Sequence, residues 1–112
     1  MELNKISEGN TVIIEFNGNL ILSDLEKARK YVKDVVDGDD ANLIIFDLTN
    51  VEFIDSAGIG FVVSVFKSVK TKNGKFALAS LKSKPHEVFK LTRLDKIIPI
   101  YENAEAAKQD LL

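Results

Sequence analysis

The sequence predicts a small α/β domain whose mixed, mostly parallel sheet has four or five strands. Strand-like apolar runs alternate with helix-like segments along the 112 residues, in the order β-β-α-β-α-β-α-β-α. Repeated strand–helix–strand units of this size favour parallel strands joined by right-handed crossovers. The length and the absence of a linker predict one domain over residues 1–112.

The first two strands are expected to form a hairpin, which gives the sheet one antiparallel edge. Leu3 to Ile6 and Thr11 to Phe16 flank the turn Glu8-Gly9-Asn10. A helix follows, starting at the capping box Ser23-Asp24-Leu25-Glu26 and ending at Asp37-Gly38. One face of this helix is apolar and comprises Leu25, Ala28, Val32, Val35 and Val36.

The middle of the chain contains the central strand, because Leu43 to Phe46 is apolar without alternation. A second helix is predicted from about Ala57 to Lys72, with Asn73-Gly74 as its C-terminal stop. Phe76 to Ser80 is the next strand.

The last third of the chain predicts two short helices around a final strand. Ser83 to Thr92 can form a helix with Pro85 in its first turn. Ile97 to Tyr101 is the last strand, and Asn103 can cap a C-terminal helix through Leu111.

Missing residue types exclude several function classes. The chain has no cysteine and a single histidine, His86, so it cannot build a thiolate nucleophile, a disulfide framework or a Cys/His zinc site. The longest apolar run, Ile59 to Phe66, is too short to cross a bilayer, and Met1-Glu2-Leu3 is unlike a signal peptide. We therefore expect a cytoplasmic domain with no metal, no cofactor and no membrane insertion.

Charge is uneven along the chain without pointing to a nucleic-acid partner. The net charge of −2 divides into −7 over residues 1–55 and +5 over residues 56–112. The lysines of the second half are spread over several elements, which argues against DNA or RNA. An acidic cluster after the first helix predicts a solvated turn and, as the weaker alternative, a cation site; it comprises Asp34, Asp37, Asp39 and Asp40.

The most informative segment is Val51 to Gly60, which places Ser56 at the start of a helix. One interpretation is that Ser56 is only an N-cap. The other is a phosphorylation site, because the positive end of the helix dipole can offset the charge of a phosphate. Such a phosphate, next to Asp55, would repel or block whatever docks there.

Two catalytic alternatives fit the same segment poorly. Gly58-Ile59-Gly60 is unlike a dinucleotide loop, since the third glycine position is Val63. A hydrolase nucleophile elbow would require glycine at Ile54, and His86 is better explained as a surface histidine than as a base for Ser56. No catalytic residue is predicted.

The run from Phe46 to Gly60, FDLTNVEFIDSAGIG, resembles the signature of the STAS-domain family, specifically the bacterial anti-sigma factor antagonists. The similarity includes Gly18, Leu91 to Ile97 and Asn103 to Ala107. It implies a partner switch: the unphosphorylated antagonist binds an anti-sigma factor that is also a serine kinase, and so releases a sigma factor. Phosphorylation at the position of Ser56 ends binding, and a PP2C-type phosphatase resets the protein. The resemblance also implies a small mixed sheet whose helices pack mainly on one face. Members are not enzymes, and we expect a monomer.

The same resemblance implies a partner-binding face made of two segments. Its residues are Asn19, Ile21, Ser23, Asp24, Ile54, Asp55, Ser56, Ala57, Gly58 and Ile59. The family usually shows Gly-Glu-Leu-Asp after the second strand, whereas this chain has Gly18-Asn19-Leu20-Ile21 and lacks both acids. The main alternative function keeps the fold: a STAS subunit regulating a transporter or a stress-signalling complex without sigma-factor control.

Overall fold

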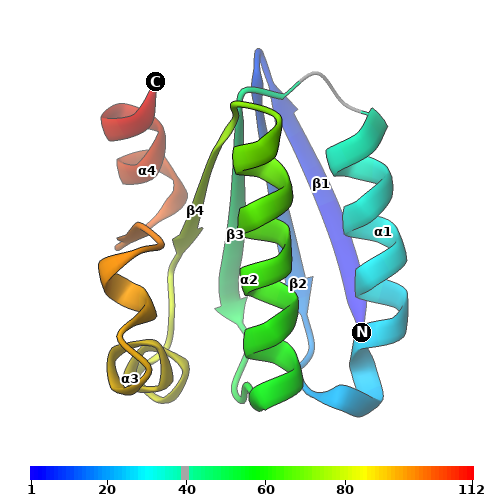
Figure 1. Ribbon diagram of the computed structural model, residues 1–112, viewed down its shortest axis with the longest axis vertical. Coiled ribbons are helices and arrows are strands. Elements are labelled where there is room, and N and C mark those ends of the chain that lie inside the picture. The colour runs from blue at the N-terminus through cyan, green and yellow to red at the C-terminus, as the bar shows by residue number, and fades with distance from the viewer. Residues whose placement is uncertain (39–40) are drawn as a thin grey trace.

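A computed structural model describes residues 1–38 and 41–112 and contains, in that part of the chain, one five-stranded sheet (Figure 1). The strand order is β1-β2-β3-β4-β5, and only β1 runs antiparallel to its neighbour among the paired strands described. The predicted mixed, mostly parallel sheet is confirmed. The strands are β1 (Glu2–Glu8), β2 (Thr11–Asn17), β3 (Leu43–Asn50), β4 (Lys75–Ala79) and β5 (Ile100–Tyr101).

The helices lie mainly on one face of this sheet, as predicted. Figure 1 shows α1 and α2 side by side in front of the sheet and α4 apart from them. The helices are α1 (Leu25–Gly38), α2 (Ser56–Thr71), α3 (Ser83–Leu91) and α4 (Ala104–Leu111), with short 3-10 helices η1 (Leu22–Asp24) and η2 (Leu94–Lys96). Within the described residues, no helix is both long enough and apolar enough to span a bilayer.

The two faces of the sheet are packed differently. The larger core lies under α1, α2 and α3 and contains a set of mutually contacting rings; the Phe16 and Phe46 centroids are 4.6 Å apart. The opposite face is covered by α4, where Ala107 packs on Ala77 and Ala79. Small side chains let this short helix approach the sheet closely, so α4 is the exception to the one-sided arrangement.

The capping box predicted at Ser23 is wrong. Residues 22–24 form η1, and α1 begins only at Leu25. The Ser23 hydroxyl donates instead to Asp24 Oδ1 at 3.4 Å. A tight turn has therefore replaced the side-chain cap, because Asp24 N–H already donates to the Ile21 carbonyl within η1.

The last strand is shorter than the predicted Ile97 to Tyr101. Residues 94–96 form η2, and the Ile97 and Ile98 amides donate back to the Leu94 carbonyl. Only Ile100 and Tyr101 pair with β4. The C-terminal helix is confirmed, since Asn103 Oδ1 accepts the Ala106 amide at 2.8 Å.

One buried hydroxyl lacks a partner, and its removal should stabilise the domain. Thr11 is fully buried at the start of β2, and no hydrogen bond to its Oγ1 occurs within the described residues. Thr11→Val keeps the shape and removes the desolvated hydroxyl, so we expect the free energy of unfolding to rise by about 1 kcal/mol. Urea unfolding measures this. Thr49→Val is the control: that hydroxyl donates to Asp47 Oδ1 at 2.6 Å, and its loss should not stabilise; equal gains would contradict the explanation.

Docking of α4 should weaken at alkaline pH because of Tyr101. Its hydroxyl donates to the Asp110 carboxylate on α4, which raises the pKa of Tyr101 to about 12 from its ordinary 10.0. The raised pKa means that the folded state favours the neutral phenol, so this contribution is complete below pH 10.0 and is lost as pH rises towards about 12. Tyr101→Phe should have a lower melting temperature than the wild type near neutral pH. Between pH 10.0 and about 12, its melting temperature should fall less than that of the wild type. Parallel losses in both proteins would contradict the assignment.

Candidate functional site

Asp55, rather than Ser56, caps α2. Its backbone is extended, and its carboxylate Oδ1 accepts the Gly58 amide at 2.9 Å. Ser56 is the first residue of the helix itself, so the interpretation of Ser56 as an N-cap is wrong. The serine hydroxyl is thereby released from a structural role at the helix start.

The second carboxylate oxygen of Asp55 ties α2 to the segment before α1. Oδ2 accepts the Leu22 amide at 3.0 Å, from a residue 33 positions earlier in the chain. These two backbone donors, Leu22 N–H first and Gly58 N–H second, hold the pKa of the Asp55 carboxyl below its ordinary value. Asp55 therefore carries its negative charge beside Ser56 at neutral pH.

The two predicted segments of the binding face lie side by side. Leu20 and Ile54 form an isolated parallel bridge. The Leu20 amide donates to the Phe53 carbonyl at 3.0 Å, and the Asp55 amide donates to the Leu20 carbonyl at 3.1 Å. The expectation that the loop after β2 lies near the Ser56 turn is confirmed.

Asn19, one of the two positions that depart from the family pattern, joins these segments. Its Oδ1 accepts both the Glu52 and the Phe53 amides, each at 3.1 Å. An amide oxygen accepts two backbone donors here without adding charge. The departure at Asn19 thus preserves the geometry of the face while making its loop less acidic.

Gly58 is required by a close backbone approach, whereas Gly60 is not. A Cβ on Gly58 would lie 2.0 Å from the Leu20 carbonyl oxygen and 2.8 Å from Ile54 Cγ1. A Cβ on Gly60 would meet nothing within 4 Å. Only Gly58 therefore sets how closely α2 approaches the Leu20 segment.

Ser56 combines exposure with a free hydroxyl. Its side chain is exposed, and within residues 1–38 and 41–112 the structure gives its Oγ no hydrogen bond. It stands at the N-terminus of a 16-residue helix whose first turn contains no acidic side chain. A phosphate on this oxygen would face the positive end of the helix and lie next to the Asp55 carboxylate.

Two exposed apolar side chains border Ser56 in the same pair of segments. Leu22 lies within the loop from Asn19 to Ser23 that is expected to dock, whereas Phe53, next to Ile54, is not among the predicted contacts. Leu22 is 72% exposed and Phe53 is 51% exposed. Lys84 Nζ lies 5.0 Å from the centre of the Phe53 ring, which brings α3 to the edge of this face. Large apolar side chains exposed beside a polar loop indicate a docking surface. The sequence alone could not reveal this, because exposure is known only once the chain is folded.

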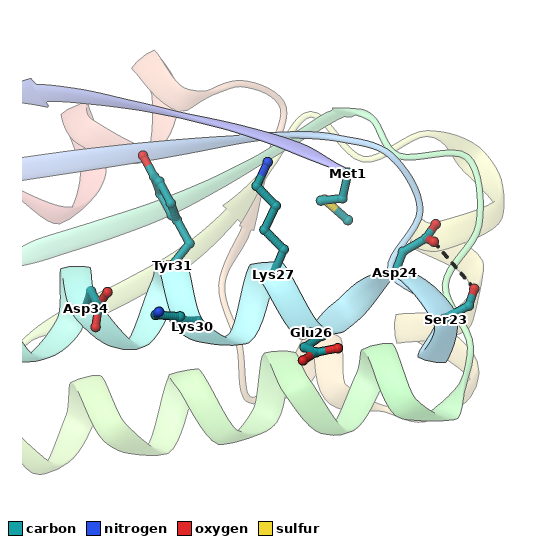
Figure 2. A pocket seen from close by; sticks show the side chains of 8 residues that line it. All are labelled: Met1, Ser23, Asp24, Glu26, Lys27, Lys30, Tyr31 and Asp34. Carbon is teal, nitrogen blue, oxygen red and sulfur yellow. Dashed lines mark hydrogen bonds between the residues drawn. The ribbon is translucent and has the colours of Figure 1, made fainter.

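The remaining residues predicted to contact a partner lie either on this face or in a neighbouring groove. Ile21, Ile54, Ala57 and Ile59 are half-buried. Ser23 and Asp24 line a groove of about 730 Å³ that runs along α1 (Figure 2). Figure 2 shows Lys27 and Tyr31 of α1 pointing towards β1, with Met1 above the helix. Asp24 and Ser23 thus connect the face to this groove.

The remaining candidate residues are not brought to Ser56. His86 is half-buried and lines hollows beside α3 and β5, with neighbours that include Leu81 and Tyr101 but not Ser56. In the acidic cluster, Asp37 pairs with Lys33 at 2.7 Å, while Asp39 and Asp40 lie outside the described residues. The described part of the chain contains no group of three side chains suited to hold a metal ion.

Comparison with known proteins identifies the family. The family model of the STAS domain matches residues 2–107. A Thermotoga maritima protein provisionally named an anti-sigma factor antagonist is 33% identical over 102 residues, which cover 91% of this chain and 90% of that protein. The anti-sigma F factor antagonist of Paenibacillus polymyxa is 26% identical over 100 residues, covering 89% of this chain and 86% of the relative.

Solved structures agree with the sequence comparison. The crystal structure of the Thermotoga maritima relative superimposes with a TM-score of 0.89 at 31% identity, covering 97% of this chain and 93% of that one. The antagonist SpoIIAA in its unphosphorylated form gives a TM-score of 0.79 at 20% identity, which shows a shared fold, over 96% of this chain and 95% of that one. The chain therefore belongs to the STAS-domain family of anti-sigma factor antagonists, which are regulators and not enzymes.

Proposed function

We propose that this chain is a cytoplasmic, monomeric phosphorylation switch that binds an anti-sigma factor with serine kinase activity and thereby releases a sigma factor. The observation that supports this most directly is Ser56: an exposed hydroxyl at the first residue of α2, with the capping role taken by Asp55. The family assignment supports an anti-sigma factor as the partner.

The docking face consists of the residues implied by the resemblance, together with Leu22 and Phe53. Leu22 and Phe53 supply apolar contact area on the two segments that Asn19 and Asp55 lock together. Because the hydrogen bonds to Asp55 and Asn19 fix the backbone at Leu22 and Phe53 before binding, the two segments lose little backbone freedom when a partner docks. The unphosphorylated face thus combines apolar side chains with the carboxylates of Asp24 and Asp55.

Phosphorylation of Ser56 ends binding by electrostatics and steric block. The phosphate adds a charge of about −1.5 to −2 next to the Asp55 carboxylate, in the centre of an apolar contact. Covering two adjacent negative groups with a partner costs their solvation, so affinity falls. The helix dipole tolerates the phosphate in the free protein, and a PP2C-type phosphatase removes it.

The test is phosphorylation by the cognate kinase with ATP, mapped by mass spectrometry. Phosphate is expected on Ser56, and none on Ser56→Ala. Ser64→Ala, an exposed serine two turns along the same helix, is the control and should be phosphorylated like the wild type. Phosphate mapped to another residue, or a normal reaction of Ser56→Ala, would overturn the proposal.

Binding provides the second measurement. Ser56→Asp should weaken the complex with the kinase at least about tenfold, and the authentic phosphoprotein more strongly, since one carboxylate carries less charge than a phosphate. Capture from native lysate with Ser56→Ala as bait identifies the partner class. Recovery of transporter or stress-complex subunits without an anti-sigma factor would favour the alternative function.

A further inference from the structure

The tip formed by the end of α3 and η2 exposes two large aliphatic side chains away from Ser56. Leu91 is 77% exposed and Ile97 is 60% exposed. The tip is anchored from within, because Phe89 and Ile98 are buried in the main core. The structure thus holds this segment firmly against the domain while leaving Leu91 and Ile97 in solvent, where burying apolar surface would be favourable.

A tight turn holds the tip together. Arg93 adopts a left-handed backbone conformation with φ of 61°, and its amide donates to the Lys90 carbonyl at 3.0 Å. The Thr92 hydroxyl donates to the Val88 carbonyl at 2.9 Å. Both aliphatic side chains are therefore carried on a compact structure that is formed before any partner arrives.

Three cations lie within a few residues of the two aliphatic side chains in the chain. Lys90, Arg93 and Lys96 are exposed, and none of them forms an ion pair within the described part of the chain. From Lys90 to Ile97 there are three Lys/Arg against one Asp/Glu, a local net charge of +2 in a protein whose total is −2. The charge that complements this tip is negative.

From these observations we infer that the α3–η2 tip binds an anionic lipid surface. Leu91 also borders a hollow whose other lining residues are Ser83, His86, Glu87 and Lys90. Exposed aliphatic side chains with cations close to them in the chain are suited to a bilayer, where the aliphatic groups enter the acyl boundary and the cations meet lipid phosphates.

The site is separate from the proposed switch. Lys84, which contacts Phe53, and Leu91 are seven residues apart on α3, or roughly 10 Å along the helix. The residues that would bind lipid at the tip and those of the proposed docking face do not overlap. Ser56→Asp should bind vesicles like the wild type, whether or not Ser56 is a phosphorylation site.

The experiment is sedimentation of the full chain with vesicles of phosphatidylcholine alone and of phosphatidylcholine with phosphatidylglycerol in equal amounts. We expect binding to the anionic vesicles only, and less binding as salt is raised. The triple variant Lys90→Gln/Arg93→Gln/Lys96→Gln should lower the partition coefficient on the order of a hundredfold, since each cation contributes roughly fivefold. Leu91→Ser/Ile97→Ser should lower it at least about tenfold.

Two controls separate the tip from general charge and hydrophobicity. Lys27→Gln/Lys30→Gln/Lys67→Gln removes the same charge from α1 and α2, and Leu112→Ser removes an equally exposed leucine, 70% exposed, at the C-terminal end. Both should bind nearly as the wild type does. If the wild-type protein does not sediment with anionic vesicles, the inference is overturned. That result is expected if the tip binds an acidic protein instead. Equal binding to neutral vesicles, or an equal loss in the lysine control, also overturns the inference.

Discussion

Gly58→Ala is expected to destabilise the domain by about 3 kcal/mol, lowering its melting temperature by at least about 10 °C. The added Cβ would lie 2.0 Å from the Leu20 carbonyl oxygen and 2.9 Å from the carbonyl carbon. These are backbone atoms held by the Leu20–Ile54 bridge, so α2 and the loop must separate to admit the methyl group. Thermal unfolding followed by circular dichroism measures the loss.

Gly60→Ala is the matched control on the same helix. Its Cβ would meet no atom within 4 Å, and alanine favours the helix over glycine. We expect this variant to gain about 0.5–1 kcal/mol in the free energy of unfolding. Similar losses in both variants would mean that helix propensity, rather than the contact with Leu20, decides the role of Gly58.

Leu22→Ala and Phe53→Ala should each lower the affinity for the anti-sigma factor about tenfold, and the double variant should lower it about a hundredfold. Both side chains are large, apolar and exposed on segments held rigid beside Ser56. Truncating such an anchor at the centre of an interface costs about 1–3 kcal/mol. Titration calorimetry with the kinase isolated through the Ser56→Ala bait gives the affinities.

Stability and position provide the controls for that experiment. Leu22 and Phe53 contribute little to the core, so the melting temperatures of both variants should stay close to that of the wild type. Leu112→Ala removes a comparably exposed leucine from the other end of the chain and should leave affinity unchanged. Unchanged affinity in the double variant would mean that the docking face does not include Leu22 and Phe53. The phosphorylation of Ser56 is tested separately by the kinase experiment.

Most of the fold could be predicted from local patterns. The Gly9-Asn10 turn, the apolar face of α1 and the stop at Asn73 depend on residues close together in sequence. Apolar spacing reports directly which side of a helix or strand is buried. The short β5 could not be predicted this way. Ile97 and Ile98 have the apolar pattern of a strand, but their amides donate to the Leu94 carbonyl in a turn.

The position of the site could be predicted from the sequence, but not which of Asp55 and Ser56 caps α2. Ser and Asp are both good caps, so the neighbouring Asp55 and Ser56 compete for the start of α2. The competition is decided by the Leu22 amide, which lies far away in sequence and bonds the second oxygen of Asp55. The capping box at Ser23 is wrong for a local reason, because the Asp24 amide already donates to the Ile21 carbonyl in η1.

The sequence by itself determined the element order, the family and the serine at the start of α2, because these depend on spacing and residue identity along the chain. The tertiary structure decided that Asp55 takes the cap, that Asn19 ties two loops together and that Leu22 and Phe53 remain in solvent. The contacts of Asp55 with Leu22 and of Asn19 with Glu52 join residues that are 33 positions apart, and the exposure of Leu22 and Phe53 depends on the whole fold. No local pattern contains that information.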